Sequence, residues 1–370
     1  MQIKLQPRNT PSQFWQILSP LVALFGTIFS AIILFSLNGK SPMLGLETLL
    51  ISPLINPYPI TEIIVKAAPI LLIALGLAIC FQGKIWNIGA EGQFIVGAIF
   101  GSAVAIFFPN INNYSLLFFC LVAGIIGGAI WASIPAFLKV QFNTNEILTS
   151  LMLNYIAISL LNYSLRGPLQ DTQGFNFPES AIFSEFATLP PLIPGTRLHL
   201  GIIFAAILAI ILWFILKRSL FGFSLRIVGA SLPAAEYAGI NRKRIIWLSL
   251  LLSGGLAGLA GVCQVTGLIG QLRTTISPGY GYAAIVAAFI GRLNPLMIIL
   301  SSLLLAQLYV GSELLQIKLG LPLALASIFQ GILLFCLLST DLLIYNKILI
   351  TNYLLPMPNA PCPITYYLLP

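Results

Sequence analysis

The sequence predicts an all-α protein that crosses a membrane about ten times, and three observations support this fold class. Charged residues make up 8% of the 370 residues, whereas soluble domains carry about 25%. The mean hydropathy is +0.98. Apolar runs of about 20 residues, the length that crosses a bilayer as a helix, recur along the chain. This small number of charged residues cannot cover a water-facing surface. We therefore expect a polytopic membrane protein without a large soluble domain.

We place ten spanning helices on these runs. The first run is longer than the apolar core of a signal peptide, which reaches about 15 residues, so we expect it to remain as a span. The seventh run is rich in glycine and the eighth is short, so the sequence does not fix the residues at which these two spans begin and end. The predicted spans are 17–37, 62–80, 90–108, 114–139, 146–165, 200–216, 244–267, 280–292, 295–312 and 321–340.

The loops between the spans predict the orientation, because cytoplasmic loops carry an excess of Lys and Arg. Loop 217–244 carries six basic residues and one Glu, whereas loop 166–198 carries two basic and three acidic residues. With loop 217–244 inside and an even number of spans, both termini are cytoplasmic. An odd count, or a missed span before residue 217, would reverse one of these loops.

Several kinds of site are excluded. The five cysteines form no CxxC pair, and the single histidine, His199, has no partners for a metal site. The stretch LNGKS (37–41) lacks the first glycine of a phosphate loop, because Leu34 occupies that position. We therefore expect no catalytic residues, no metal and no cofactor. The basic residues lie between apolar runs, so no nucleic-acid partner is expected.

Small residues recur at the four-residue spacing that allows close helix packing. Gly254 and Gly258 form a GxxxG pair, and Gly261 extends a series of small residues from Ser253 and Ala257. Because lipid gives helices no hydrophobic drive to associate, such positions supply close contact instead. We expect these residues to pack helices together, whatever the activity.

Three polar stretches interrupt the apolar pattern, and the first is FQGKIWNIGAEGQF (81–94). Its glycines weaken helix geometry, and Asn87, Glu91 and Gln93 would lie at or within the membrane. A non-helical backbone at that depth is tolerated when it is buried in protein or lines a cavity. Two interpretations stay open: a discontinuous helix along a solute path, or a cytoplasmic turn with Lys84 at its tip.

The second interruption is FNTNEILTSLMLNY (142–155). Thr144 or Asn145 can accept a hydrogen bond from the first turn of the helix that follows, so we expect an N-cap there. Asn154 lies deeper in the apolar run and needs a polar partner, which could be another helix or a solute.

The third interruption is VGASLPAAEYAGINRKRI (228–245). Ser231 suits an N-cap and Gly239 suits the residue after a helix C-terminus, so we expect a helix of about two turns between them. Basic residues flank this helix, which is compatible with an interfacial helix on anionic headgroups. Its small, alanine-rich surface is better suited to a groove on another protein.

These stretches resemble the permease subunit of bacterial ABC importers, in the superfamily that transports ribose, nucleosides and branched-chain amino acids. The resemblance covers roughly residues 60–340 and is strongest for the nucleoside or simple-sugar branch. The matching stretches include NIGAEGQF (87–94), NEILTSLMLNYIA (145–157), FGFSLRIVGASLPAAEYAGI (221–240), LLSGGLAGLAG (251–261) and SPGYGYAAIVAAFIGRLNP (277–295).

The resemblance implies a function and partners. The helix within 231–240 would be a coupling helix that contacts a separate ATPase subunit, while this chain itself hydrolyses nothing. A second permease chain, related or identical, and an extracytoplasmic solute-binding protein would complete the importer. It would lie among the lipids of the bacterial plasma (inner) membrane and carry a small-molecule solute. The residues expected at the ATPase are Ser231, Ala234, Ala235, Glu236 and Gly239.

The resemblance also implies a translocation path and a domain organisation. Gly254, Gly258 and Gly261 would pack the helices that move. The domains would be an N-terminal segment with the first span (1–60), the permease domain (61–340) and a C-terminal tail (341–370). The residues expected along the path are Asn87, Glu91, Gln93 and Asn154.

One departure and one alternative remain. Leu293 and Asn294 stand where the family often has Asn and His, so a polar role of that loop is not carried over from the family. The alternative function is a secondary transporter driven by an ion gradient, which needs a deeply buried ionisable residue. Glu91 is the candidate for that role.

Overall fold

The computed structural model describes residues 2–7, 12–171 and 177–351. The chain divides into two compact units, a main unit (28–332) and a terminal unit (1–27 with 333–370). The helices are α1 (Gln13–Leu37), α2 (Pro42–Leu46), α3 (Ser52–Ile55), α4 (Pro57–Gln82), α5 (Ala90–Phe107), α6 (Ser115–Phe142), α7 (Glu146–Leu165), α8 (Gly201–Arg218), α9 (Leu220–Ala230), α10 (Leu232–Tyr237), α11 (Arg242–Cys263), α12 (Tyr280–Ile290), α13 (Pro295–Leu319) and α14 (Leu325–Tyr345). Short π-helical segments cover Glu47–Ile51 and Gln264–Ile269, and a 3-10 turn covers Glu185–Ala187.

Seven helices in the described part of the chain are long and apolar enough to cross a membrane: α4, α5, α6, α7, α8, α11 and α13. They coincide with seven of the predicted spans, which confirms a polytopic membrane protein. The predicted first and last spans fall on α1 and α14, which are 25 and 21 residues long. The total of ten spans stays a prediction.

The eighth predicted span, 280–292, is not a full spanning helix. Helix α12 has only 11 residues, which cover about 16 Å at 1.5 Å per residue, whereas a bilayer core needs about 30 Å. Non-helical backbone precedes it, including Gly279 at a φ of 97°. A hydropathy pattern cannot separate a half-length helix from a span, because both are uniformly apolar.

The all-α prediction also missed one feature of the terminal unit. Strands β1 (Gln2–Pro7) and β2 (Asn346–Thr351) pair antiparallel, with Gln2 opposite Thr351 and Pro7 opposite Asn346. Pairing between opposite ends of the chain leaves no local signal in the sequence. The predicted tail, 341–370, therefore begins with the end of α14 and with β2, and its remainder lies outside the described residues.

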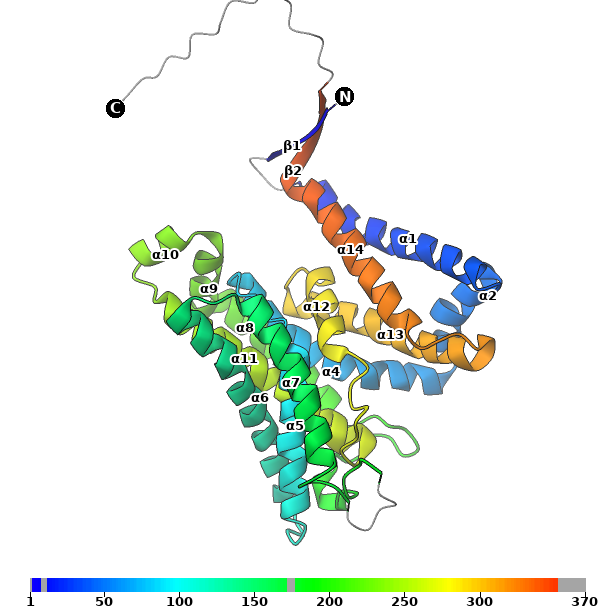
Figure 1. The fold of residues 1–370 in the computed structure, drawn as a ribbon. Helices are drawn as coiled ribbons and strands as arrows, with labels where there is room; N and C mark the ends of the chain where they lie inside the picture. The colour runs from blue at the N-terminus through cyan, green and yellow to red at the C-terminus, as the bar shows by residue number, and fades with distance from the viewer. Residues whose placement is uncertain (1, 8–11, 172–176, 352–370) are drawn as a thin grey trace, which may run out of the picture. The chain divides into compact units, whose positions relative to one another are not determined.

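Helix α4 lies at the centre of the main unit. Its spanning window is 94% buried, whereas that of α8 is 28% buried. Helix α11 packs against α4, α5 and α6, and Figure 1 shows α5, α6, α7 and α11 running side by side. A mostly apolar helix that is buried this deeply is enclosed by other helices, while the outer helices keep apolar faces for lipid.

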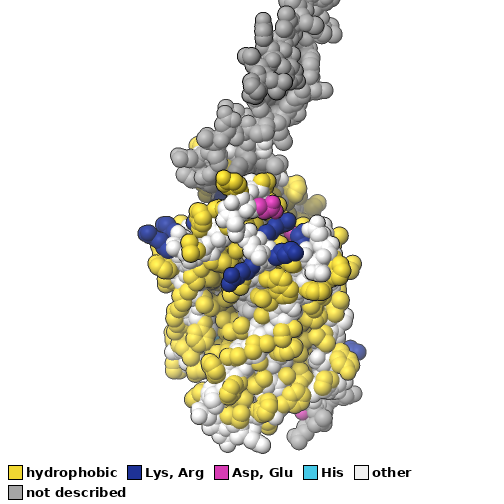
Figure 2. Space-filling view, turned by 90° about the vertical axis from the view of Figure 1, so that its left-hand side faces the viewer, with side chains coloured by type: hydrophobic (Ala, Val, Ile, Leu, Met, Phe, Trp, Pro, Cys, Tyr) yellow, Lys and Arg dark blue, Asp and Glu magenta, His cyan; other side chains and the backbone are white. Residues whose placement is uncertain are grey.

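The two ends of the main unit differ in charge. Helices α9 and α10, the α4–α5 turn and the α6–α7 turn line one cavity at the same end, which we call the basic end. Figure 2 shows Lys and Arg side chains gathered toward this end of a face that is otherwise mostly hydrophobic. At the opposite end, the loop after α7 pairs with the segment after α11 through Glu179 and Arg273.

Candidate functional site

The first polar interruption breaks the helical backbone between α4 and α5. The chain is non-helical from Gly83 to Gly89, and Lys84 takes a left-handed φ of 53°. Lys84 is exposed, while Ile85 and Asn87 are buried. Both open interpretations describe part of this segment: a turn with Lys84 at its tip leads into a buried, discontinuous stretch.

Asn87 and Gln93 bond each other inside the protein. The Asn87 Nδ2 donates to the Gln93 Oε1 at 2.9 Å and to the Ser253 Oγ of α11 at 3.0 Å. The Gln93 Nε2 returns a bond to the Asn87 Oδ1 at 3.1 Å. The two amides are thereby satisfied, which removes most of the cost of burying them.

Asn154 joins α7 to the same segment. Its Oδ1 accepts from the Gly92 backbone N–H at 2.8 Å, and its Nδ2 donates to the Ile88 carbonyl at 3.0 Å and to the Tyr282 hydroxyl at 3.3 Å. The polar partner that Asn154 requires is therefore supplied by the chain itself. At the start of α7, Asn145 accepts from the Ile147 N–H at 3.0 Å, which confirms the predicted N-cap.

Glu91 holds the start of α12, which lies inside the bundle. Its Oε2 accepts from the Gly281 N–H at 2.6 Å, and the Ser277 hydroxyl oxygen accepts from the Gly279 and Tyr280 N–H groups. The first N–H groups of a helix lack partners within the helix and attract negative charge. The carboxylate thus has a structural partner, and no observation favours the ion-gradient alternative.

The four residues predicted along the path are brought together, but in this conformation they are closed off. Their exposed fractions are 0% for Asn87, 5% for Glu91, 1% for Gln93 and 0% for Asn154. We call these four residues with Ser253 the polar joint. It connects α5, α7, α11 and α12 through hydrogen bonds rather than lining an open channel.

Tight glycine contacts surround the polar joint. A Cβ added to Gly258 would overlap the Gly124 carbonyl oxygen of α6, and one added to Gly261 would overlap the Phe94 carbonyl oxygen of α5. A Cβ added to Gly254 would likewise overlap the Gly128 carbonyl oxygen of α6. The predicted small-residue face of α11 is therefore where three helix backbones approach one another.

Two charged residues of α4 form ion pairs that the sequence did not predict. The Lys66 Nζ pairs with the Glu313 carboxylate of α13, and Glu62 lies 3.7 Å from the Arg197 Nη1. The signal was present, because Glu62 and Lys66 are four residues apart in an apolar run and so share a helix face. Their partners are distant in sequence and could not be assigned.

Helix α10 forms as predicted at the basic end. The Ser231 Oγ accepts from the Ala234 N–H at 3.4 Å, and Gly239 ends the helix at a φ of 70°. Ala235 is 1% exposed, whereas Tyr237 is 98% exposed. The outward face therefore carries Glu236 and Tyr237, while Ala235 points into the protein, unlike the contact expected of it.

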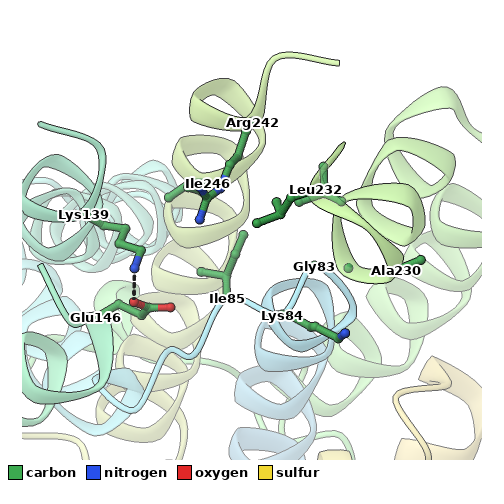
Figure 3. A pocket seen from close by; sticks show the side chains of 11 residues that line it. Gly83, Lys84, Ile85, Lys139, Glu146, Ala230, Leu232, Arg242 and Ile246 are labelled. Carbon is green, nitrogen blue, oxygen red and sulfur yellow. Dashed lines mark ion pairs between the residues drawn. The ribbon is translucent and has the colours of Figure 1, made fainter. Parts of the chain in front are cut away.

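A cavity of about 180 Å³ lies beneath α10 (Figure 3). Leu232 of α10 and Ile85 of the α4–α5 segment both line it, opposite a Lys139–Glu146 ion pair of 2.8 Å. Beside it, Gly229 of α9 packs so closely on Gln82 that a Cβ would overlap the Gln82 carbonyl oxygen. Helix α10 packs on α9, and α9 packs on the end of α4, where the segment that leads into the polar joint begins.

Fold and site together define a polytopic membrane protein with an exposed short helix beside a buried helix break. The family described as the permease component of the branched-chain amino acid transport system matches residues 60–338. The chain belongs to this family, and the sequence-based identification of an ABC transporter permease is confirmed.

Three relatives are similar over most of their length. The chain is 32% identical over 354 residues to a glucose ABC transporter permease protein of Haloferax volcanii, covering 92% of each chain. It is 31% identical over 328 residues to a guanosine ABC transporter permease protein of Bacillus subtilis, covering 88% of this chain and 93% of that one. It is 30% identical over 306 residues to a nucleoside ABC transporter permease protein of Lactococcus lactis, covering 80% and 84%.

Proposed function

We propose that this permease moves a nucleoside or a simple sugar across the plasma membrane, driven by an ATPase subunit that docks on α10. The names of the three relatives, which specify guanosine, nucleosides and glucose, support this solute class. The observation that carries the docking is the exposure of α10, whose Tyr237 is 98% exposed on a membrane protein's basic end. A large aromatic side chain that exposed is a suitable anchor for a partner.

The proposed coupling runs through contacts. Movement of α10 and α9 on ATP binding would act on the end of α4 through the Gly229–Gln82 contact and would reshape the cavity that Leu232 and Ile85 both line. The segment between α4 and α5 leads directly to Asn87. Separation of α12 from α5 would break the Glu91–Gly281 bond and open the polar joint to the solute.

The assembly follows from the same proposal. The basic end faces the cytoplasm, in accordance with the excess of basic residues in loop 217–244. Both termini are then cytoplasmic. A second permease chain and an extracytoplasmic solute-binding protein complete the importer, and ATP hydrolysis takes place in the separate ATPase subunit.

Uptake in cells tests the proposal. The chain is expressed with its neighbouring ATPase, permease and binding protein, and labelled nucleosides, pentoses and hexoses are supplied with and without ATP depletion. We expect ATP-dependent uptake of one of these solutes. Transport that continues without ATP would contradict the mechanism, and uptake of none of them would contradict the solute class.

A double variant isolates the docking surface. Glu236→Lys with Tyr237→Ala should abolish uptake and lower ATPase co-purification, while insertion in the membrane stays normal, because both side chains are exposed. Tyr58→Ala is the control, since Tyr58 is also an exposed tyrosine (58%). It lies at the start of α4, whereas the basic end is at the other end of α4. Normal uptake in the double variant would overturn the assignment of α10.

A further inference from the structure

A second pocket lies at the basic end, and none of the residues that line it belongs to α10 or to the polar joint. It has a volume of about 420 Å³ and lies between the end of α8, α9, the end of α4 and the α12–α13 turn. Its lining includes Trp213, Lys217, Arg226, Arg292 and Asn294. These residues come from separate parts of the main unit and are assembled only by the fold.

The pocket is strongly cationic. Three basic side chains line it, and no carboxylate belongs to its lining among the residues that the structure describes. The Lys217 Nζ lies 5.0 Å from the centre of the Trp213 ring, and the Arg226 Nη1 donates to the Leu216 carbonyl. Both side chains are thereby held at the pocket.

The backbone of the α12–α13 turn is shaped around the same pocket. Arg292 and Leu293 take left-handed φ angles of 53° and 55°, and the Gln82 Nε2 donates to the Leu293 carbonyl at 2.9 Å. Left-handed residues other than glycine are costly and need support from their surroundings. The bond from α4 therefore keeps this side of the pocket in place.

Two apolar tracks lead away from the pocket along membrane-spanning helices. On α8, Ile207, Ile210 and Phe214 are 49%, 58% and 61% exposed and follow one another at helical spacing toward Lys217. On α13, Met297 and Leu300 are 53% and 65% exposed, just after the Pro295 that lines the pocket. Both tracks belong to helices that meet each other in the main unit.

We propose that this pocket binds the headgroup of an anionic phospholipid, whose two acyl chains lie on the exposed faces of α8 and α13. Basic pockets between spanning helices at the cytoplasmic side hold anionic headgroups, and tryptophan favours the same interface. The two apolar tracks distinguish a lipid from a soluble phosphate compound, which would use the cations but leave both tracks empty. The pocket is separate from α10 and from the polar joint.

The test measures lipid binding to the full-length protein, purified with its partner subunits and placed in bilayer nanodiscs or detergent. Phosphatidylglycerol and phosphatidylcholine with identical acyl chains are titrated, and bound lipid is counted by native mass spectrometry. We expect phosphatidylglycerol to bind at least about tenfold more tightly, since each basic residue near a membrane contributes about 1 kcal/mol toward an anionic surface.

Matched double variants locate the site. Lys217→Gln with Arg226→Gln should weaken phosphatidylglycerol binding about tenfold, whereas Lys243→Gln with Arg244→Gln, which removes the same charge from exposed positions outside the pocket, should leave it unchanged. Elution volume and melting temperature monitor folding. Because Arg226 also bonds the backbone, Lys217→Gln alone serves as a second variant and should weaken binding by at least about threefold.

Three results would overturn the proposal. Equal binding of both lipids would remove the need for an anionic headgroup. Equal losses in the two double variants would mean that general charge, rather than this pocket, attracts the lipid. Displacement of phosphatidylglycerol by millimolar inorganic phosphate, with no contribution from chain length, would assign the pocket to a soluble anion instead. None of these measurements depends on which solute is transported.

Discussion

The polar joint and α10 are both polar interruptions of an apolar sequence, but they have opposite surroundings. In the joint, Asn87 and Gln93 bond each other and are almost fully buried. In α10, Tyr237 is 98% exposed. A polar break enclosed by helices must satisfy its own hydrogen bonds, while a break at the end of the bundle can leave side chains free for a partner. Substitutions in the joint should therefore affect stability, and those in α10 should affect coupling.

The largest effect is expected where the helices around the joint pack. Gly258→Leu should destabilise the protein by about 3 kcal/mol or prevent assembly, because any side chain there overlaps the α6 backbone. Thermal unfolding in detergent measures this loss. Gly331→Leu is the control, since a Cβ at Gly331 has open space around it and should change little. A normal melting temperature for Gly258→Leu would contradict the close packing.

A smaller loss is expected within the joint itself. Asn87→Leu should cost about 1–3 kcal/mol, because it leaves the buried Gln93 amide without its partner. The double variant Asn87→Leu with Gln93→Leu should lose less than the sum of the two single variants, since neither polar group is left alone. Additive losses would show that the two amides do not act as a pair.

The loop between α7 and α8, at the end of the main unit opposite the basic end, contains the buried side chain of His199. The His199 Nδ1 accepts from the Gly201 N–H at 3.2 Å, and burial lowers the pKa of His199 to about 4. An unfolded histidine has a pKa of about 6.5, so protonation favours the open loop. The stability of this loop should be complete above about pH 6.5 and fall as the pH approaches about 4.

Hydrogen exchange of residues 177–200 at several pH values measures this effect. His199→Gln has no titrating group and should remove the change between pH 6.5 and 4. If protection from hydrogen exchange falls with pH equally in the wild-type protein and in His199→Gln, His199 is not the group responsible.

The smallest effects on stability are expected in α10. Ser231→Ala removes the N-cap and should cost about 1 kcal/mol locally, which hydrogen exchange of α10 would detect. Tyr237→Ala should change the free energy of unfolding by less than about 0.5 kcal/mol, because it's an exposed position. A large loss of stability from Tyr237→Ala would mean that Tyr237 packs against the rest of the protein and is not exposed for a partner.

Local features were largely predictable from the sequence. The spans of the central helices follow from the length of the apolar runs, and the caps at Asn145 and Ser231 follow from hydrogen bonds within one helical turn. The polar residues of the joint were also identified, because an amide in an apolar run requires a partner wherever it lies. In each case the cause and the effect are within a few residues of each other.

Only the tertiary structure decided which groups meet. Glu91 caps a helix 190 residues away, Lys66 pairs with Glu313, and the cationic pocket collects residues from four parts of the chain. It also decided that Ala235 faces inward and that α12 is too short to span. Composition and periodicity determine that a residue is apolar, polar or helical, but a hydrogen bond or an ion pair forms between particular atoms, and these are brought within reach by the packing of distant helices.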